Sequence, residues 1–173
     1  MATVILDAGH GGWDNGARYG THVEKDDNLA LALAVGEILS QNGVNVLYTR
    51  VTDIYEAPIQ KARDANRSGA DYMISLHRNS SPVPNQYAGV ESFVYSLEGA
   101  ATRMARNINA QLAQVGYNNL GVKERTNLIV LNSTNIPAIL VEVGFINSDE
   151  DNYLFDVFFA QTAQAIAVGI LES

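Results

Sequence analysis

The chain has 173 residues, no cysteine and a net charge of −8, from 19 acidic and 11 basic residues. This length is typical of one domain, and a compact chain of this size buries roughly 70% of its unfolded surface. We therefore expect a single domain over residues 1–173. The absence of cysteine excludes a disulfide framework, a thiolate nucleophile and any cysteine-based metal site, so a bound metal ion would need histidine and carboxylate ligands.

The acidic balance argues against nonspecific binding to nucleic acid or to an anionic membrane surface, because both need clustered lysine and arginine. No stretch approaches the 18 consecutive apolar residues of a membrane span. Residues 1–7 carry no lysine or arginine before a short apolar run, which is not the pattern of a secretion signal. We expect no nucleic-acid or membrane partner, and a chain that is either not exported by that route or is part of a longer protein.

Short β-branched runs alternate with longer segments of helical periodicity, which is typical of an α/β domain. This pattern predicts a mainly parallel sheet of about six strands, flanked by helices on both faces. The predicted strands are Thr3 to Asp7, Val44 to Tyr48, Tyr72 to Leu76, Val90 to Tyr95, Leu128 to Leu131 and Ala138 to Val143. The predicted helices are Asn28 to Gln41, with Leu29, Leu33, Gly36 and Ile38 near one face, Pro58 to Ser68, Glu98 to Val115 and Phe158 to Leu171, and a helical turn opens at Ser148.

Two of the three histidines directly follow predicted buried strands. His10 lies in the glycine-rich segment DAGHGG, and His77 follows YMISL. In an open α/β sheet, ligands bind beyond the carboxyl ends of the strands. A single histidine there is commonly structural, but two at equivalent strand ends favour a functional site.

Two glutamates complete this set. Glu142 lies within the apolar strand ILVEVGF, where a carboxylate is costly unless a charge or hydrogen bonds satisfy it. A nearby cation or a role in proton transfer would explain it, and a structural salt bridge is the alternative. Glu24 precedes the first helix and is a natural carboxylate partner for the histidines, although it also suits the first turn of a helix. Two histidines, one carboxylate ligand and a separate glutamate base have the composition of a catalytic zinc site.

Four dispersed motifs carry a family resemblance over essentially the whole chain. They are DAGHGG at 7–12, VEKDDNLALA at 23–32, ISLHRNSS at 74–81 and PAILVEVGFINS at 137–148. In this order and at this spacing they resemble the zinc-dependent N-acetylmuramoyl-L-alanine amidases of the type 3 family. The resemblance implies an α/β fold and cleavage of the amide that joins the lactyl group of muramic acid to L-alanine in peptidoglycan.

Carried over position by position, the resemblance makes His10, Glu24 and His77 the zinc ligands and Glu142 the catalytic glutamate. Zn²⁺ would polarise the scissile carbonyl and lower the pKa of its bound water toward about 7. Glu142 would take a proton from the water and return it to the departing nitrogen. Many relatives have a small residue where this chain has Arg78, which affects substrate preference rather than the metal site.

Several further residues have weaker signals. Asp7 is placed to orient a ligand imidazole, or is a plain strand-end carboxylate. His22 lies two residues from Glu24 and competes with the other histidines as a ligand, although a solvated loop histidine is the simpler interpretation. Asn79 matches a family position, where its amide caps the loop or touches the glycopeptide. Arg125, Asn127, Trp13 and Tyr19 are candidates for lining a groove, with surface or core placement as the simpler alternative.

The expected substrate is peptidoglycan, and the expected place of action is the bacterial cell wall, extracellular or reached on phage lysis, as an endolysin or autolysin catalytic domain. Bacterial walls are rich in anionic polymers, so a chain of charge −8 gains no general attraction to them. We therefore expect a wall-binding module outside these residues. Only residues 79–89 separate two predicted strands, which leaves no room for an inhibitory helix.

The sequence leaves three alternative functions to compare with the amidase interpretation. A zinc carboxypeptidase acting on the stem peptide would use the same metal chemistry. A noncatalytic wall-binding module would keep the fold but would not need Glu142. A nucleotide-binding loop is disfavoured, because a GxGxxG motif starting at Gly9 would need glycine at the position of Asp14.

Overall fold

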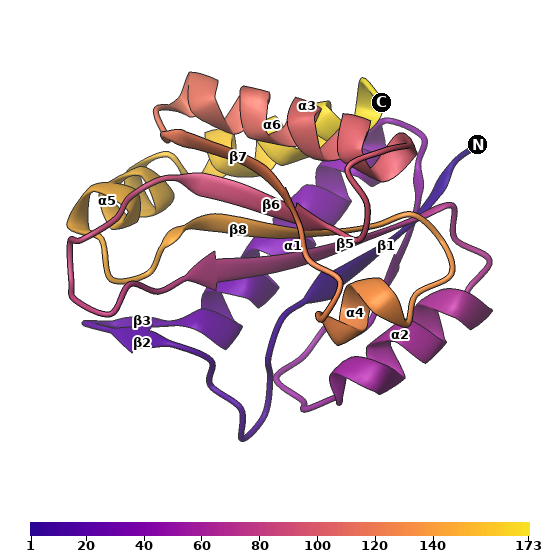
Figure 1. Cartoon of the computed structure of the whole chain (residues 1–173), viewed down its shortest axis with the longest axis horizontal. Coiled ribbons are helices and arrows are strands. Elements are labelled where there is room, and N and C mark those ends of the chain that lie inside the picture. Colours follow the sequence, from indigo (N-terminus) through magenta and orange to yellow (C-terminus); the bar gives the residue numbers. More distant parts are fainter.

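A computed structural model describes all 173 residues as a central sheet between layers of helices (Figure 1). The six strands of the sheet lie in the order β4-β1-β5-β8-β6-β7. Their bounds are β1 Thr3–Ala8, β4 Asn45–Tyr48, β5 Tyr72–Asn79, β6 Val90–Val94, β7 Asn119–Glu124 and β8 Ala138–Phe145. The strands β4, β1, β5 and β8 are parallel, whereas β6 runs antiparallel to β8 and β7 runs parallel to β6. The predicted α/β class with a mainly parallel six-stranded sheet is confirmed.

Side-chain alternation divides the core into two parts, one on each face of the sheet. Alternate residues such as Leu6, Leu76 and Val141 point into the larger cluster, which also contains residues of α1 (Glu24–Gln41), α3 (Ala100–Val115) and α6 (Phe159–Leu171). The residues between them, such as Met73 and Leu140, point into a smaller cluster. That cluster is closed by α2 (Pro58–Arg67) and α4 (Ile129–Asn132).

The smaller cluster covers only part of its face. On β5 and β8 it contains Met73, Ala138 and Leu140, which lie toward the amino ends of these strands. Farther along the same face the alternation brings His77 and Glu142 into register with each other. The uncovered carboxyl end of this face is therefore polar, and Figure 1 shows α2 and α4 together beneath the other end of the sheet.

Three predictions about individual elements were wrong. Residues Leu128 to Leu131 do not form a strand but lead into the short helix α4, whose Val130 and Leu131 pack against the smaller core. The sixth strand is β7, which has no fully buried residue and therefore lacked an apolar signal. In α1, Leu33 does not share the face predicted for it: it is 38% exposed, whereas Gly36 is buried and Leu29 and Ile38 pack against the larger core, whose fully buried α1 residues include Leu31, Val35 and Leu39.

The remaining elements lie at the edges of the sheet. A small hairpin, β2 Arg18–Tyr19 and β3 His22–Val23, leads directly into α1. The helical turn predicted at Ser148 extends to a full helix, α5 Asp149–Val157, and the Ser148 side chain accepts a hydrogen bond from the Asp151 amide as its N-cap. No single helix has the length and apolar character needed to cross a membrane; α5 and α6 meet that criterion only together, as a pair bent by 86°.

The close packing of α6 on α3 depends on a glycine. A Cβ atom added to Gly169 would lie 2.5 Å from Cα of Ile108, which is rigid backbone. We expect Gly169→Ala to lower the free energy of unfolding by roughly 1–3 kcal/mol, because the two helices must separate. Urea unfolding measures this change.

Gly36→Ala is the matched control, because it is also a helix-interior change. Its added Cβ would lie 1.9 Å from the hydroxyl oxygen of Tyr48, which ends a side chain that can rotate away. The gain in helix propensity, about 1 kcal/mol, offsets the free-energy cost of moving the Tyr48 side chain. Equal losses of stability in the two variants would contradict this account of the α3–α6 contact.

Candidate metal centre

The candidate centre begins in the glycine-rich loop that follows β1. His10 has φ 62°, a left-handed conformation that is uncommon for a residue with a side chain. Glycines on either side allow close packing around it. A Cβ atom at Gly9 would lie 2.2 Å from Cε1 of His77, and one at Gly16 would lie 2.5 Å from Oε2 of Glu24. The loop therefore needs glycine at both positions to let three polar side chains converge.

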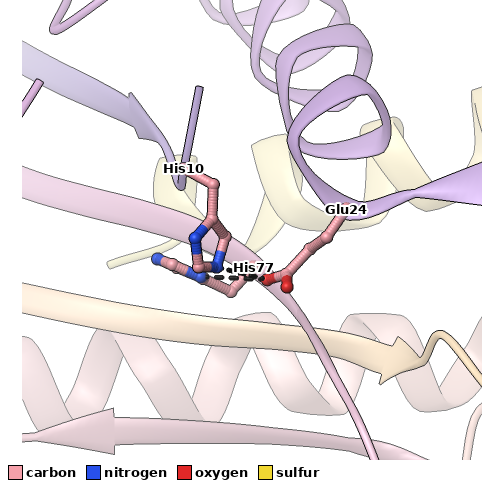
Figure 2. A group of neighbouring side chains, drawn as sticks. All are labelled: His10, Glu24 and His77. Carbon is pink, nitrogen blue, oxygen red and sulfur yellow. Dashed lines mark hydrogen bonds and ion pairs between the residues drawn. The ribbon is translucent and has the colours of Figure 1, made fainter. Parts of the chain in front are cut away.

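The three convergent side chains are His10, Glu24 and His77. Oε1 of Glu24 lies 3.2 Å from Nε2 of His10 and 3.1 Å from Nδ1 of His77. One potential ligand atom from each residue lies within 4.8 Å of the others. Figure 2 shows the Glu24 carboxylate, at the start of α1, directed toward the two imidazole rings. Two imidazole nitrogens and a carboxylate oxygen form a donor set that suits Zn²⁺ and similar transition-metal ions.

Neighbouring groups hold these side chains in place. The other ring nitrogen of His10, Nδ1, lies 2.9 Å from Oδ2 of Asp14, which turns Nε2 toward Glu24. The Ala17 amide donates to Oε2 of Glu24 at 2.9 Å, and the Arg78 amide donates to Oε1 at 3.1 Å. Glu24 is only 4% exposed, so its carboxylate is fixed by the backbone rather than by solvent.

The electrostatics favour a positive charge at the centre of the cluster. Burial alone would raise the pKa of Glu24, but its hydrogen bonds and charge interactions with His10 and His77 hold that pKa far below its usual range. Burial lowers the pKa of His10, but the hydrogen bond and charge of Glu24, aided by Asp14, outweigh it and raise that pKa to about 9. The buried carboxylate of Glu24 therefore favours positive charge beside it, such as a proton on His10 or a bound cation.

Glu142 lies beside this cluster, in direct register with His77 across β5 and β8. Its Oε2 atom is buried and has no hydrogen-bond partner. Burial is the main reason why its pKa is raised to about 7, and the negative charges of Glu24 and Glu91 add to the effect. A carboxylate with this pKa exchanges protons near neutrality, as a general acid–base group must.

Two buried cations behind the cluster were not identified from the sequence. Lys61 of α2 lies 2.8 Å from Oδ1 of Asp7 and donates to the Ala8 carbonyl at 3.0 Å. Arg50 donates to the Ala8 carbonyl at 3.0 Å and to the Gly9 carbonyl at 3.1 Å. Both cations therefore fix the backbone that leads to His10. Arg50 follows the end of β4, so the strand-end criterion that identified the histidines applies to it as well.

The buried carboxylate of Asp7 is hydrogen-bonded and ion-paired to Thr49, Ser75 and Lys61 rather than to an imidazole. Burial raises its pKa, but the charge and hydrogen bond of Lys61, with a hydrogen bond from Ser75, lower it overall. The hydroxyl of Ser75 donates to Oδ2 at 2.6 Å, and that of Thr49 donates to Oδ1 at 2.7 Å. Asp7 supports the loop through Lys61 rather than by orienting a histidine.

The structure separates His22 from the cluster. Its Nδ1 lies 2.8 Å from Oδ2 of Asp27, and its Nε2 lies 3.1 Å from Oδ2 of Asp156. Arg78 is buried on the opposite face of the sheet from His77. Its guanidinium donates one hydrogen bond to the Val143 carbonyl at 3.1 Å and another to Asp27 at 2.9 Å. Its guanidinium thus ties the start of α1 to β8, which explains why a large residue fits there.

Of the other residues named from the sequence, only Asn127 borders a cavity that a cluster residue lines. Trp13 is 75% exposed and its ring stacks on that of Tyr55, with centroids 4.4 Å apart. Asn127 lines a cavity of about 300 Å³ that borders His77, together with residues of α4. The guanidinium of Arg125 covers the ring of Phe93 at 5.0 Å.

The two remaining residues are held by hydrogen bonds. The Tyr19 hydroxyl donates to Asp149 at 3.0 Å. Nδ2 of Asn79 donates to Oε1 of Glu91 at 2.7 Å, while Oδ1 of Asn79 accepts from the Ser80 amide at 2.9 Å.

A larger cavity, of about 600 Å³, lies between α3 and α6 and is lined by no ionisable side chain. The clustered chemistry, rather than cavity size, marks the candidate site.

Comparison with known proteins decides the family. The sequence profile of N-acetylmuramoyl-L-alanine amidases matches residues 4–172. This chain belongs to that amidase family. A sporulation-specific N-acetylmuramoyl-L-alanine amidase of Bacillus subtilis is 34% identical, over 98% of this chain and 67% of its own length. An endolysin of Bacillus phage SPP1 is also 34% identical, over 98% of this chain and 65% of its own length.

Solved structures of amidases have the same fold. An N-acetylmuramoyl-L-alanine amidase from Clostridium difficile 630 superposes with a TM-score of 0.92 at 31% identity, covering 99% of this chain and 95% of that one. The catalytic domain of the amidase CwlV from Bacillus (Paenibacillus) polymyxa var. colistinus gives 0.89 at 34% identity, covering 99% and 97%. Cwp6 from Clostridium difficile gives 0.93 at 33% identity, but this chain covers only 29% of it. The chain thus matches the catalytic domain of one amidase over almost its full length, and matches only part of a longer protein such as Cwp6.

The raised pKa of Glu142 has a consequence for stability. Its folded-state value of about 7 exceeds the ordinary 4.5, so the stability that its protonated form contributes is present below pH 4.5 and is lost as the pH rises toward 7. Wild-type protein without metal should lose about 3 kcal/mol from this group between pH 4 and pH 8. We expect Glu142→Gln to avoid that loss and to be more stable than wild type at pH 8, but not at pH 4. Denaturant unfolding of the two proteins across this pH range measures the difference, and parallel pH profiles would contradict it.

Proposed function

We propose that this chain is a zinc-dependent peptidoglycan hydrolase that cleaves the amide bond between N-acetylmuramic acid and L-alanine. The observation that carries the proposal is the pairing of a two-histidine, one-carboxylate cluster with a buried carboxylate that has no partner for one oxygen. Family membership supports the substrate class. The ligands proposed for Zn²⁺ are His10, Glu24 and His77, and the proposed general base is Glu142.

Each residue then has a definite role. A zinc ion held by the three ligands would supply Lewis-acid chemistry, polarising the scissile carbonyl and acidifying water. Glu142 accepts a proton from the attacking water and returns it to the amide nitrogen of L-alanine as the bond breaks. Arg50 and Lys61 keep the loop of His10 fixed, so that these groups need not reorganise during the reaction.

The place of action follows from the substrate. We infer that the chain acts at the bacterial cell wall, as the catalytic domain of an endolysin or an autolysin. The chain spans only 59% to 67% of the length of several amidase and endolysin relatives. That supports a wall-binding module outside these residues, since a net charge of −8 does not attract the chain to anionic wall polymers.

Product analysis tests the reaction. Purified cell walls digested with the zinc-loaded protein should release intact stem peptides whose L-alanine carries a free amine, detected by mass spectrometry. Glu142→Gln should lower the rate by roughly 10²- to 10⁴-fold, because it removes the base but keeps the side-chain volume. The exposed Glu150 of α5 provides the control, and Glu150→Gln should retain the wild-type rate.

The alternatives give different products. A carboxypeptidase would shorten the stem peptide and leave its bond to muramic acid intact. A noncatalytic wall-binding module would release nothing from the wall, and Glu142→Gln would then change nothing. Either result would refute the amidase proposal.

A further inference from the structure

A row of ionisable side chains crosses the open face of the sheet and continues beyond His77 and Glu142. His77 on β5 is in register with Glu142 on β8, and Glu142 is in register with Glu91 on β6. Directly opposed residues of neighbouring strands point to the same face. Glu91 forms an ion pair with Lys123 of the adjacent strand β7. The row therefore runs from the proposed metal ligands to the far edge of the sheet.

Each carboxylate oxygen of Glu91 already has a hydrogen-bond partner. Its Oε1 atom accepts from Nδ2 of Asn79 at 2.7 Å, and its Oε2 atom accepts from Nζ of Lys123. Only 8% of Glu91 is exposed, so it cannot itself be the main contact for a large ligand. Its carboxylate instead holds the Lys123 ammonium at a fixed position.

Lys123 is the group of this pair that can meet a ligand. Its side chain remains 50% exposed, and an ammonium group has three hydrogen-bond donors, of which Glu91 uses one. A cavity of about 440 Å³ opens at this point. Its lining includes the polar residues Asn79, Glu91 and Lys123 and the apolar residues Tyr87, Leu120 and Phe145. The cavity thus combines apolar and aromatic side chains with a polar side, where Lys123 is the only cation and the Glu91 carboxylate is already paired with it. It lies next to the strand position of Glu142.

The chemistry of the substrate indicates which part belongs there. This inference rests on the proposed amidase function, in which the scissile bond has a glycan on one side and a peptide on the other. The glycan offers hydroxyl and N-acetyl groups, whereas carboxylates belong to the stem peptide. A partly desolvated ammonium binds a carboxylate more strongly than a neutral acceptor. We propose that this cavity is the subsite for the stem peptide, and that Lys123, positioned by Glu91, binds a carboxylate of that peptide.

Two matched soluble substrates test this proposal on the zinc-loaded protein. Both are N-acetylmuramoyl-L-alanyl peptides, and they differ only in whether the residue after L-alanine carries a free α-carboxylate or its carboxamide. Wild type should cleave the carboxylate form with the higher kcat/KM. Lys123→Met should lower kcat/KM for that form by roughly tenfold, mainly through KM, and change the carboxamide form much less.

Two control variants separate the specific contact from net charge. Lys123→Arg keeps a cationic donor and should preserve the preference for the carboxylate substrate. Arg103→Met also removes one positive charge, from an exposed position on α3 on the opposite side of the sheet, and should leave both rates unchanged. Unfolding curves establish that each variant is folded, which is expected because Lys123 is half-exposed.

The outcomes distinguish the subsite from the reaction. If wild type releases no free L-alanine amine from either substrate, the amidase function fails and the subsite with it. If wild type is active but shows no preference, or if Lys123→Met retains the preference, the subsite is refuted and the amidase function stands. Loss of the preference in Lys123→Met, with retention in Lys123→Arg, supports the subsite.

Discussion

The structure of the site depends on one carboxylate oxygen, Oε1 of Glu24. Nitrogens of His10 and His77 and the backbone amide of Arg78 all lie within 3.2 Å of it. A buried carboxylate requires such partners, because an unpaired charge in the interior is strongly destabilising. Bringing these groups together requires side-chain-free positions at Gly9 and Gly16, whose added Cβ atoms would overlap the converging groups.

The surrounding fold maintains this arrangement from both faces of the sheet. On one face, Lys61 and Arg50 bind the carbonyls that precede His10. On the other, the Arg78 guanidinium joins β8 to Asp27 in the first turns of α1. The smaller core ends before the carboxyl ends of β5 and β8, so the same face that packs against α2 and α4 is open where Glu142 lies. The smaller core and the candidate site thus lie on the same face of the sheet, the core toward the amino ends of the strands and the site toward their carboxyl ends.

The sequence contained enough information for the parallel strands, because β1, β5 and β8 are continuous apolar runs buried on both faces. It was insufficient for β7, an edge strand without a fully buried residue, and for residues 128–131, whose four apolar positions suit a strand or a short helix equally. Tertiary packing against the smaller core decides in favour of the helix.

The candidate site, like the fold, was predictable from the sequence only in part. His10, His77 and Glu142 were found because parallel strands place their carboxyl ends along one edge. The same criterion also selects Arg50, but the contacts that Arg50 and Lys61 make could not be predicted from it, because their acceptors are backbone carbonyls far away in the sequence. The two uses of Arg78, with its amide on Glu24 and its guanidinium on the opposite face, likewise depend on the three-dimensional structure.

Titration of metal-free protein with Zn²⁺ in a calorimeter tests whether the cluster around Glu24 holds one metal ion. His22 provides the control histidine, since it lies two residues from Glu24 but contacts Asp27 and Asp156 instead of the cluster. The account predicts about one high-affinity ion per chain in wild type and in His22→Ala, and its loss in His10→Ala and His77→Ala. Unchanged binding in either of the last two variants, or loss in His22→Ala alone, would contradict it.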